Sequence, residues 1–155
     1  MIDLTAPLRA IQEKYGLMDW HRNVNATQEA AALWGATVGV HCRDTGGFLA
    51  VEVVPLARVD KYANAVVKLA QAPNGTWAAS VEYQCHYLGC IVPVQVWNPV
   101  AFATREDAIQ ASAATLRQTL APLCTESCAT EASRQAAQQL CAQLDTYRCE
   151  QLTLF

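Results

Sequence analysis

The spacing of apolar residues changes twice along this 155-residue chain. Residues 4–34 show helical spacing, residues 38–97 form short alternating or apolar runs typical of strands, and residues 104–147 return to helical spacing. Helices, then strands, then helices is the order expected of an α+β fold. We therefore predict an antiparallel sheet of about four to five strands, with N-terminal and C-terminal helices packed on it.

Two short helices are predicted before the strands. The first covers residues 4–15, and Gly16 stands where a left-handed residue would end it. The second is expected to begin at Asn25, a good N-cap with Gln28 three residues later, and to end before Gly35.

The strand region is predicted to open with a hairpin. Residues 38–42 and 48–54 are strand-like runs, and the polar and glycine residues at 44–47 form the turn between them.

A clearer hairpin follows it. Residues 65–69 and 77–84 flank Asn74-Gly75, a pair that supplies the positive backbone angles of a tight turn. A further strand is predicted over residues 90–97, where Pro93 indicates an edge strand or a bulge.

Two helices are predicted after the strands. Thr104-Arg105-Glu106-Asp107 resembles a capping box, and the apolar residues that follow have helical spacing up to Leu120. Pro122 stops this helix, and the last helix is expected to begin near Thr125 or Thr130. The predicted buried positions of the two helices are Ala108, Ile109, Ala113, Leu116 and Leu120, then Ala137, Leu140, Leu144 and Tyr147.

Composition favours a packed globule. Hydrophobic residues make up 52% of the chain and charged residues 16%, and about 150 residues suffice for one core. We predict a single domain over residues 1–150, followed by a tail over residues 151–155. The start of the sequence lacks a secretory signal and no apolar run reaches the roughly 18 residues of a membrane span, so we expect a cytoplasmic protein. In that compartment its seven cysteines should be reduced thiols.

The net charge of -3 gives little attraction for a phosphate backbone, so direct binding of nucleic acid is not expected. Four tryptophans, Trp20, Trp34, Trp77 and Trp97, leave base stacking open as an alternative. A small α+β core also needs aromatic residues, and core packing is the favoured interpretation.

The last five residues carry the most specific signal. Gln151-Leu152-Thr153-Leu154-Phe155 resembles the peptide, usually Gln-Leu-x-Leu-Phe, with which bacterial replication and repair proteins dock on the DNA sliding clamp. The resemblance implies that Leu152, Leu154 and Phe155 fill an apolar pocket and that Gln151 forms hydrogen bonds beside it. Thr153 occupies the tolerant position, where Ser or Asp is usual. The alternative is that these residues finish the last helix or pack back as an edge strand.

The metal-site hypothesis rests on Cys85, His86 and Cys90, because thiolates and imidazoles are zinc ligands. The spacing is poor, since adjacent residues on a strand point to opposite faces. Buried free thiols are the favoured interpretation. Cys124 and Cys128 would share a helix face if the last helix starts early, with Cys141 and Cys149 further along it, and a cluster or a disulfide among these cysteines is the alternative.

A cysteine nucleophile with a histidine base is the remaining catalytic hypothesis. It would use Cys42 or Cys85 with His41, His86 or His21, but no neighbouring pattern marks any of them as activated. No nucleophile elbow, phosphate-binding loop or His-Glu-x-x-His occurs in the sequence.

We therefore expect a non-enzymatic interaction protein that docks on the sliding clamp and needs no cofactor. A homodimer is one option for its assembly, and a mobile element is the expected carrier of its gene. Two alternatives remain open. One is a mobile-element inhibitor of host restriction or CRISPR defence, and the other is a thiol or metal-binding protein.

Overall fold

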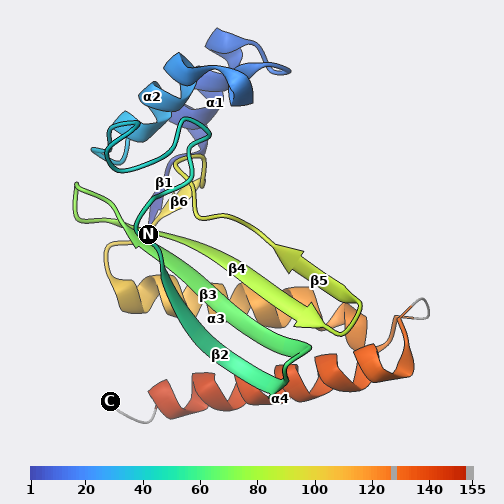
Figure 1. Ribbon diagram of the computed structural model, residues 1–155. Helices are drawn as coiled ribbons and strands as arrows, with labels where there is room; N and C mark the ends of the chain where they lie inside the picture. The colour runs from blue at the N-terminus through green and yellow to red at the C-terminus, as the bar shows by residue number, and fades with distance from the viewer. Residues whose placement is uncertain (127–128, 153–155) are drawn as a thin grey trace. The chain divides into compact units, whose positions relative to one another are not determined.

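The computed structural model describes the backbone of residues 1–126 and 129–152, with side chains as far as residue 146 (Figure 1). The chain divides into two compact units, each assembled from three stretches. Unit 1 comprises residues 1–52, 69–79 and 93–108, and unit 2 comprises residues 53–68, 80–92 and 109–155. The prediction of one domain over residues 1–150 stays a prediction.

Unit 1 begins with the predicted first helix. Its elements are β1 (Ile2–Asp3), α1 (Thr5–Tyr15), the 3-10 helix η1 (Trp20–Arg22), α2 (Val24–Ala32) and β6 (Val100–Ala101). β1 and β6 pair antiparallel, with Ile2 opposite Ala101. α1 ends as expected at Gly16, whose φ of 91° suits glycine.

The N-cap predicted for the second helix was wrong by two residues. Asn23, rather than Asn25, precedes α2, and its side chain accepts the backbone N–H groups of Asn25 at 3.0 Å and Ala26 at 3.4 Å. Asn23 has the extended backbone that a cap needs, and Asn25 lies inside the first turn.

The first predicted hairpin is absent from the structure. The backbone N–H groups of Val40 and His41 both donate to the carbonyl of Thr37, at 3.2 and 2.9 Å. Gly39 has a φ of 83°, which reverses the chain where a strand was expected. Only isolated bridges remain here, such as Cys42 opposite Phe48.

The core of unit 1 surrounds Trp34, which is fully buried. Its indole N–H donates to the carbonyl of Val96 at 2.8 Å, and its ring meets Phe48 edge-to-face at 5.8 Å. Small side chains let the elements approach closely around it. The core also includes Leu8, Ile11, Ala26, Ala30, Ala31, Cys42, Ala70, Ala72, Ala78 and Val94.

A four-stranded antiparallel sheet confirms the predicted α+β class. Its strands are β2 (Glu52–Asp60), β3 (Ala63–Gln71), β4 (Trp77–Cys85) and β5 (Leu88–Ile91), in the order β2-β3-β4-β5. The Asn-Gly hairpin joins β3 and β4 as predicted, with a φ of 86° at Gly75. β4 and β5 pair with Tyr83 opposite Cys90.

The outer strands differ from the prediction. β2 continues through Pro55 to Asp60, because an edge strand tolerates a proline that a central strand would not. The predicted strand over residues 90–97 ends at Ile91, before Pro93. Val94 and Val96 are instead buried in the core of unit 1.

One residue of the β2 edge is hydrogen-bonded to a helix of unit 2. The side-chain amide of Gln143, on α4 (Glu131–Leu152), accepts the backbone N–H of Arg58 at 2.8 Å and donates to its carbonyl at 3.1 Å. The amide thus replaces a neighbouring strand at this residue.

The C-terminal helices form where the sequence predicted them. In α3 (Arg105–Leu120) the N–H of Asp107 donates to the Thr104 hydroxyl at 3.1 Å. The 3-10 helix η2 (Pro122–Cys124) follows, and α4 begins after Thr130, the later of the two predicted starts. The predicted apolar positions with described side chains are buried: Ala108, Ile109, Ala113, Leu116, Leu120, Ala137, Leu140 and Leu144. Among the described residues, no helix has both the length and the apolar character needed to cross a bilayer.

Candidate functional sites

The clamp-binding peptide falls at the limit of the described chain. Gln151 and Leu152 are the last residues of α4, and their side chains lie outside the described part. The same is true of residues 153–155, so the predicted roles of Leu154 and Phe155 stay predictions. The part of α4 before them is fixed to unit 2 by the buried side chains of Leu140 and Leu144.

The weak metal candidates are not assembled into a site. Cys85 is fully buried at the end of β4, and Cys90 lies on β5, half-buried. His86 has a positive φ of 56°, and its Nε2 lies 4.0 Å from a carboxylate oxygen of Asp60. In the described part of the chain, no group of three or more Cys, His, Asp or Glu side chains could hold a metal ion.

The cysteines proposed as nucleophiles are in environments that oppose ionisation. Burial raises the pKa of Cys42, and burial with a smaller contribution from Cys124 raises the pKa of Cys85 to about 11. Because the thiolate is the nucleophile, both residues are held in their unreactive form near neutral pH.

The histidines named with them have other contacts. The Nδ1 atom of His41 accepts the backbone N–H of Thr37 at 3.1 Å. The ring of His21 meets Trp20 edge-to-face, with ring centroids 5.7 Å apart. Neither of these two contacts involves a cysteine.

The tryptophans mainly serve packing in unit 1. Trp34 and Trp97 are buried, at 0% and 9% exposure, and cannot offer a ring face to a base. The ring of Trp20 packs on Trp97 with centroids 4.4 Å apart. Trp77 is half-buried and pairs with Phe102 in an isolated bridge.

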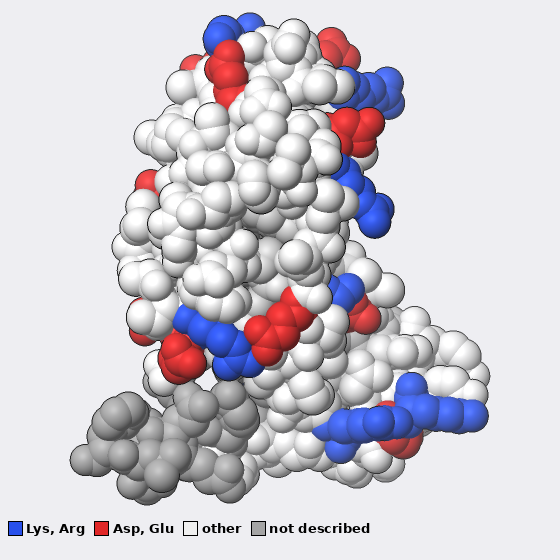
Figure 2. Space-filling view, turned by 60° about the vertical axis from the view of Figure 1, so that its left-hand side comes forward, with Lys and Arg blue, Asp and Glu red and all other residues white. Residues whose placement is uncertain are grey.

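The charged side chains do not form a basic track on the face shown in Figure 2, where basic groups stand beside acidic ones. Lys14 pairs with Glu29 at 2.5 Å and Arg117 with Asp145 at 2.9 Å. Arg105 forms a two-pronged contact with Glu52 and lowers the pKa of that carboxyl. In each of these pairs a carboxylate offsets the positive charge.

One pair of thiols is brought together in unit 2. The Sγ atoms of Cys124, half-buried in η2, and Cys141, buried in α4, are 3.9 Å apart. Burial raises the pKa of Cys141 to about 11, with Cys124 contributing, while the Arg117 guanidinium acts in the opposite direction. The sequence suggested Cys124 with Cys128, and Cys128 lies outside the described residues.

The sequence left open a cluster or a disulfide among Cys124, Cys128, Cys141 and Cys149, but it did not single out Cys124 with Cys141. The signal for that pair is that Cys141 lies between Leu140 and Leu144 on the predicted buried face of α4. A buried cysteine on that face has to meet a neighbouring element.

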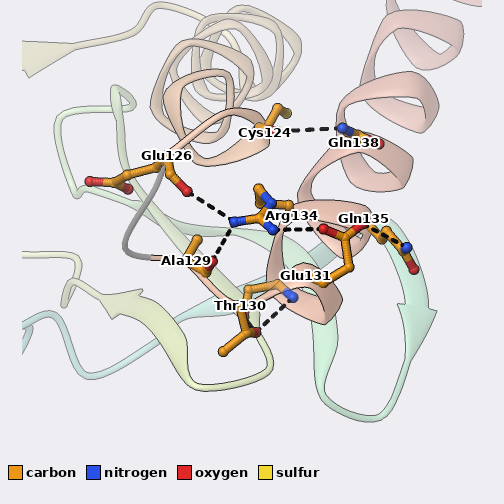
Figure 3. Close-up of polar contacts among 9 residues, drawn as sticks. Cys124, Glu126, Ala129, Thr130, Glu131, Arg134, Gln135 and Gln138 are labelled. Atoms are coloured by element: carbon orange, nitrogen blue, oxygen red, sulfur yellow. Dashed lines mark hydrogen bonds and ion pairs between the residues drawn. The ribbon is translucent and has the colours of Figure 1, made fainter.

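Polar contacts join Glu126 and Ala129 to the start of α4 (Figure 3). The guanidinium of Arg134 donates to the carbonyls of Ala129 at 2.6 Å and Glu126 at 3.4 Å, and pairs with Glu131 at 2.6 Å. The Gln138 amide donates to the carbonyl of Cys124 at 3.4 Å. Cys124 is therefore connected to α4 through its backbone as well as its thiol.

Comparison with protein-family models, with curated proteins and with solved structures finds no match to this chain. The function is therefore inferred from its own residues.

Proposed function

We propose that this protein is a non-enzymatic accessory protein that docks on the bacterial replicative sliding clamp through Gln151, Leu152, Leu154 and Phe155. The observation that carries the proposal is the agreement of these residues with the informative positions of the Gln-Leu-x-Leu-Phe docking peptide. A cytoplasmic location belongs to the same proposal, because the clamp works on chromosomal DNA.

The energetics of a short peptide support a contact of this kind. Each buried Leu or Phe side chain contributes about 1.5 to 3 kcal/mol, so three anchors can offset the ordering of the segment. The expected dissociation constant is on the order of micromolar.

The pattern of α4 also supports a separate role for the peptide. Tyr147, three residues after the buried Leu144, continues the predicted apolar face, but Arg148, Glu150 and Gln151 after it are charged or polar. The stretch just before the proposed anchors is therefore mostly polar, which favours a separate role for them.

Docking in an extended form requires Gln151 and Leu152 to leave the last turn of α4. This change is inexpensive, because the final carbonyls of a helix have no partner within it and helix ends fray readily. A structured helix and an extended bound peptide are therefore compatible.

The test is a titration of purified clamp with the full chain and with a Leu154→Ala, Phe155→Ala variant. Removing two of the three anchors should weaken binding at least about 20-fold. Thr153→Ser is the matched control, and it should bind within about two-fold of the original chain because that position is tolerant. Equal binding by the original chain and the double variant, or no binding by either, would refute the proposal.

A further inference from the structure

The Cys124 and Cys141 thiols are close enough to react with each other. Their Sγ atoms, 3.9 Å apart, must approach by about 1.9 Å to reach disulfide bonding distance. Cys124 belongs to the three-residue helix η2, where a side-chain rotation gives up only its 3.6 Å contact with the Leu120 carbonyl. No large rearrangement of α4 is needed.

The two thiols differ in access. Cys141 is buried on α4, whereas Cys124 is partly exposed and can meet a small oxidant from solvent. The Arg117 guanidinium of α3 is paired with Asp145 of α4, and burial keeps the pKa of Cys141 raised despite the opposing effect of Arg117. The pair therefore offers one partly exposed thiol that can be oxidised and a second thiol close enough to resolve it as a disulfide.

We propose that Cys124 and Cys141 are a thiol oxidation site, at which hydrogen peroxide or a related hydroperoxide converts the pair to a disulfide joining η2 to α4. This role is independent of clamp docking, because both residues lie well before the docking peptide.

The chemistry balances in two steps. The Cys124 thiolate attacks one oxygen of peroxide, so that an S–O bond forms, the O–O bond breaks, and hydroxide leaves as water after taking up the thiol proton. The Cys141 thiol then gives up its proton as its sulfur attacks the sulfenic sulfur of Cys124; the S–S bond forms, the S–O bond breaks, and the departing hydroxide takes up that proton to leave as the second water. Two thiols supply the two electrons that reduce one peroxide.

The test treats the full chain, first reduced and desalted, with dilute hydrogen peroxide, followed by intact mass measurement and non-reducing peptide mapping. The expected product is a monomer lighter by about 2 Da, with Cys124 and Cys141 in one linked peptide pair that dithiothreitol separates. Cys124→Ser and Cys141→Ser should each abolish this linked pair.

Cys90→Ser is the matched control, because Cys90 is also half-buried but lies on β5. This variant should form the disulfide as fast as the original chain. Circular dichroism of the two serine variants shows that loss of the link does not reflect unfolding. The inference is overturned if the mass does not fall, or if the main linkage joins Cys124 to Cys85 or Cys128.

Discussion

The indole of Trp34 contributes both volume and a hydrogen bond to the core of unit 1. Trp34→Phe leaves the buried carbonyl of Val96 without its N–H donor, so we expect the free energy of unfolding to fall by about 1 to 3 kcal/mol. Urea denaturation followed by circular dichroism measures this loss. Trp77→Phe, at a half-buried tryptophan, is the control and should cost less. Equal midpoints for the two variants would contradict the prediction.

The buried thiols of unit 2 should make the protein sensitive to alkali. The pKa of Cys85 and of Cys141 is about 11, above the roughly 8.5 of an unfolded thiol. As pH rises between these values, the unfolded chain loses protons that the folded chain retains, so the free energy of unfolding decreases. The stabilisation is fully present below about pH 8.5 and is lost as pH rises to about 11.

Denaturation midpoints under reducing conditions, measured from about pH 7 to 11, show this decline. Cys85→Ala and Cys141→Ala should each make it shallower, whatever their effect on stability at neutral pH. A decline of unchanged slope in both variants would show that other groups cause it.

For single residues, the sequence predicted those roles that depend on near neighbours along the chain. The Asn74-Gly75 turn and the Thr104 cap were predicted because their partners are only a few residues away. Asn23 was missed because Asn25 is an equally good cap by composition, and backbone angles decide between them. The contact of Cys124 with Cys141 requires two elements to meet, which no local pattern shows.

A hydroxyl cap at Thr130 defines the start of α4. The Thr130 hydroxyl accepts the backbone N–H of Ser133 at 3.1 Å and donates to the Ser133 hydroxyl at 2.9 Å. Ser133 is fully buried, and its hydroxyl donates to the Cys85 carbonyl on β4 at 2.9 Å. The cap is thus connected to the sheet.

Thr130→Ala removes the cap and should reduce the free energy of unfolding by about 1 kcal/mol. Thr130→Ser retains the hydroxyl and should restore most of it. Thr119→Ala, at an exposed position in the last turn of α3, is the matched control and should change stability by less than about 0.5 kcal/mol. Thermal or urea unfolding measures all three, and equal losses at positions 119 and 130 would reject the capping role.

Elements with a long regular period were predicted well, and irregular ones were not. Buried apolar residues recur over several turns of α3 and α4, so the helical pattern remains clear despite single residues that do not fit it. Residues 38–42 were predicted as a strand because they are apolar, but Gly39 adopts a positive φ and the segment turns. The strand predicted over residues 48–54 shares only its last three residues with β2, which continues through Pro55 because an edge position accepts a proline.

For the whole molecule, the hydrogen bonds from Gln143 to the β2 edge should limit self-association. The Gln143 amide occupies the N–H and carbonyl of Arg58, which otherwise present hydrogen-bonding groups to another chain. Gln143→Ala should therefore increase dimer or aggregate formation, measured by light scattering over a range of concentrations. Gln139→Ala, another exposed glutamine of α4, is the control and should behave like the original chain. The prediction fails if both variants remain equally monodisperse.

The candidate sites were less predictable than the fold. A docking peptide can be recognised from sequence because its binding depends on a few side chains in order, and its partner supplies the pocket. A metal site is harder to predict, because its ligands must meet at one point in the fold. Cys85, His86 and Cys90 are suitable ligand types, but in the described part of the chain they do not form such a group.

α4 has a mechanical consequence for anything bound at its end. Its 22 residues contain neither glycine nor proline, so the helix is a stiff rod of about 33 Å. Leu140 and Leu144 fix it to unit 2. With Gln151 and Leu152 unwound for docking, a clamp would still be held within a few residues of this rod, and its angular freedom relative to unit 2 would be smaller than on a long flexible tether. Docking would then set the orientation of unit 2 together with its location.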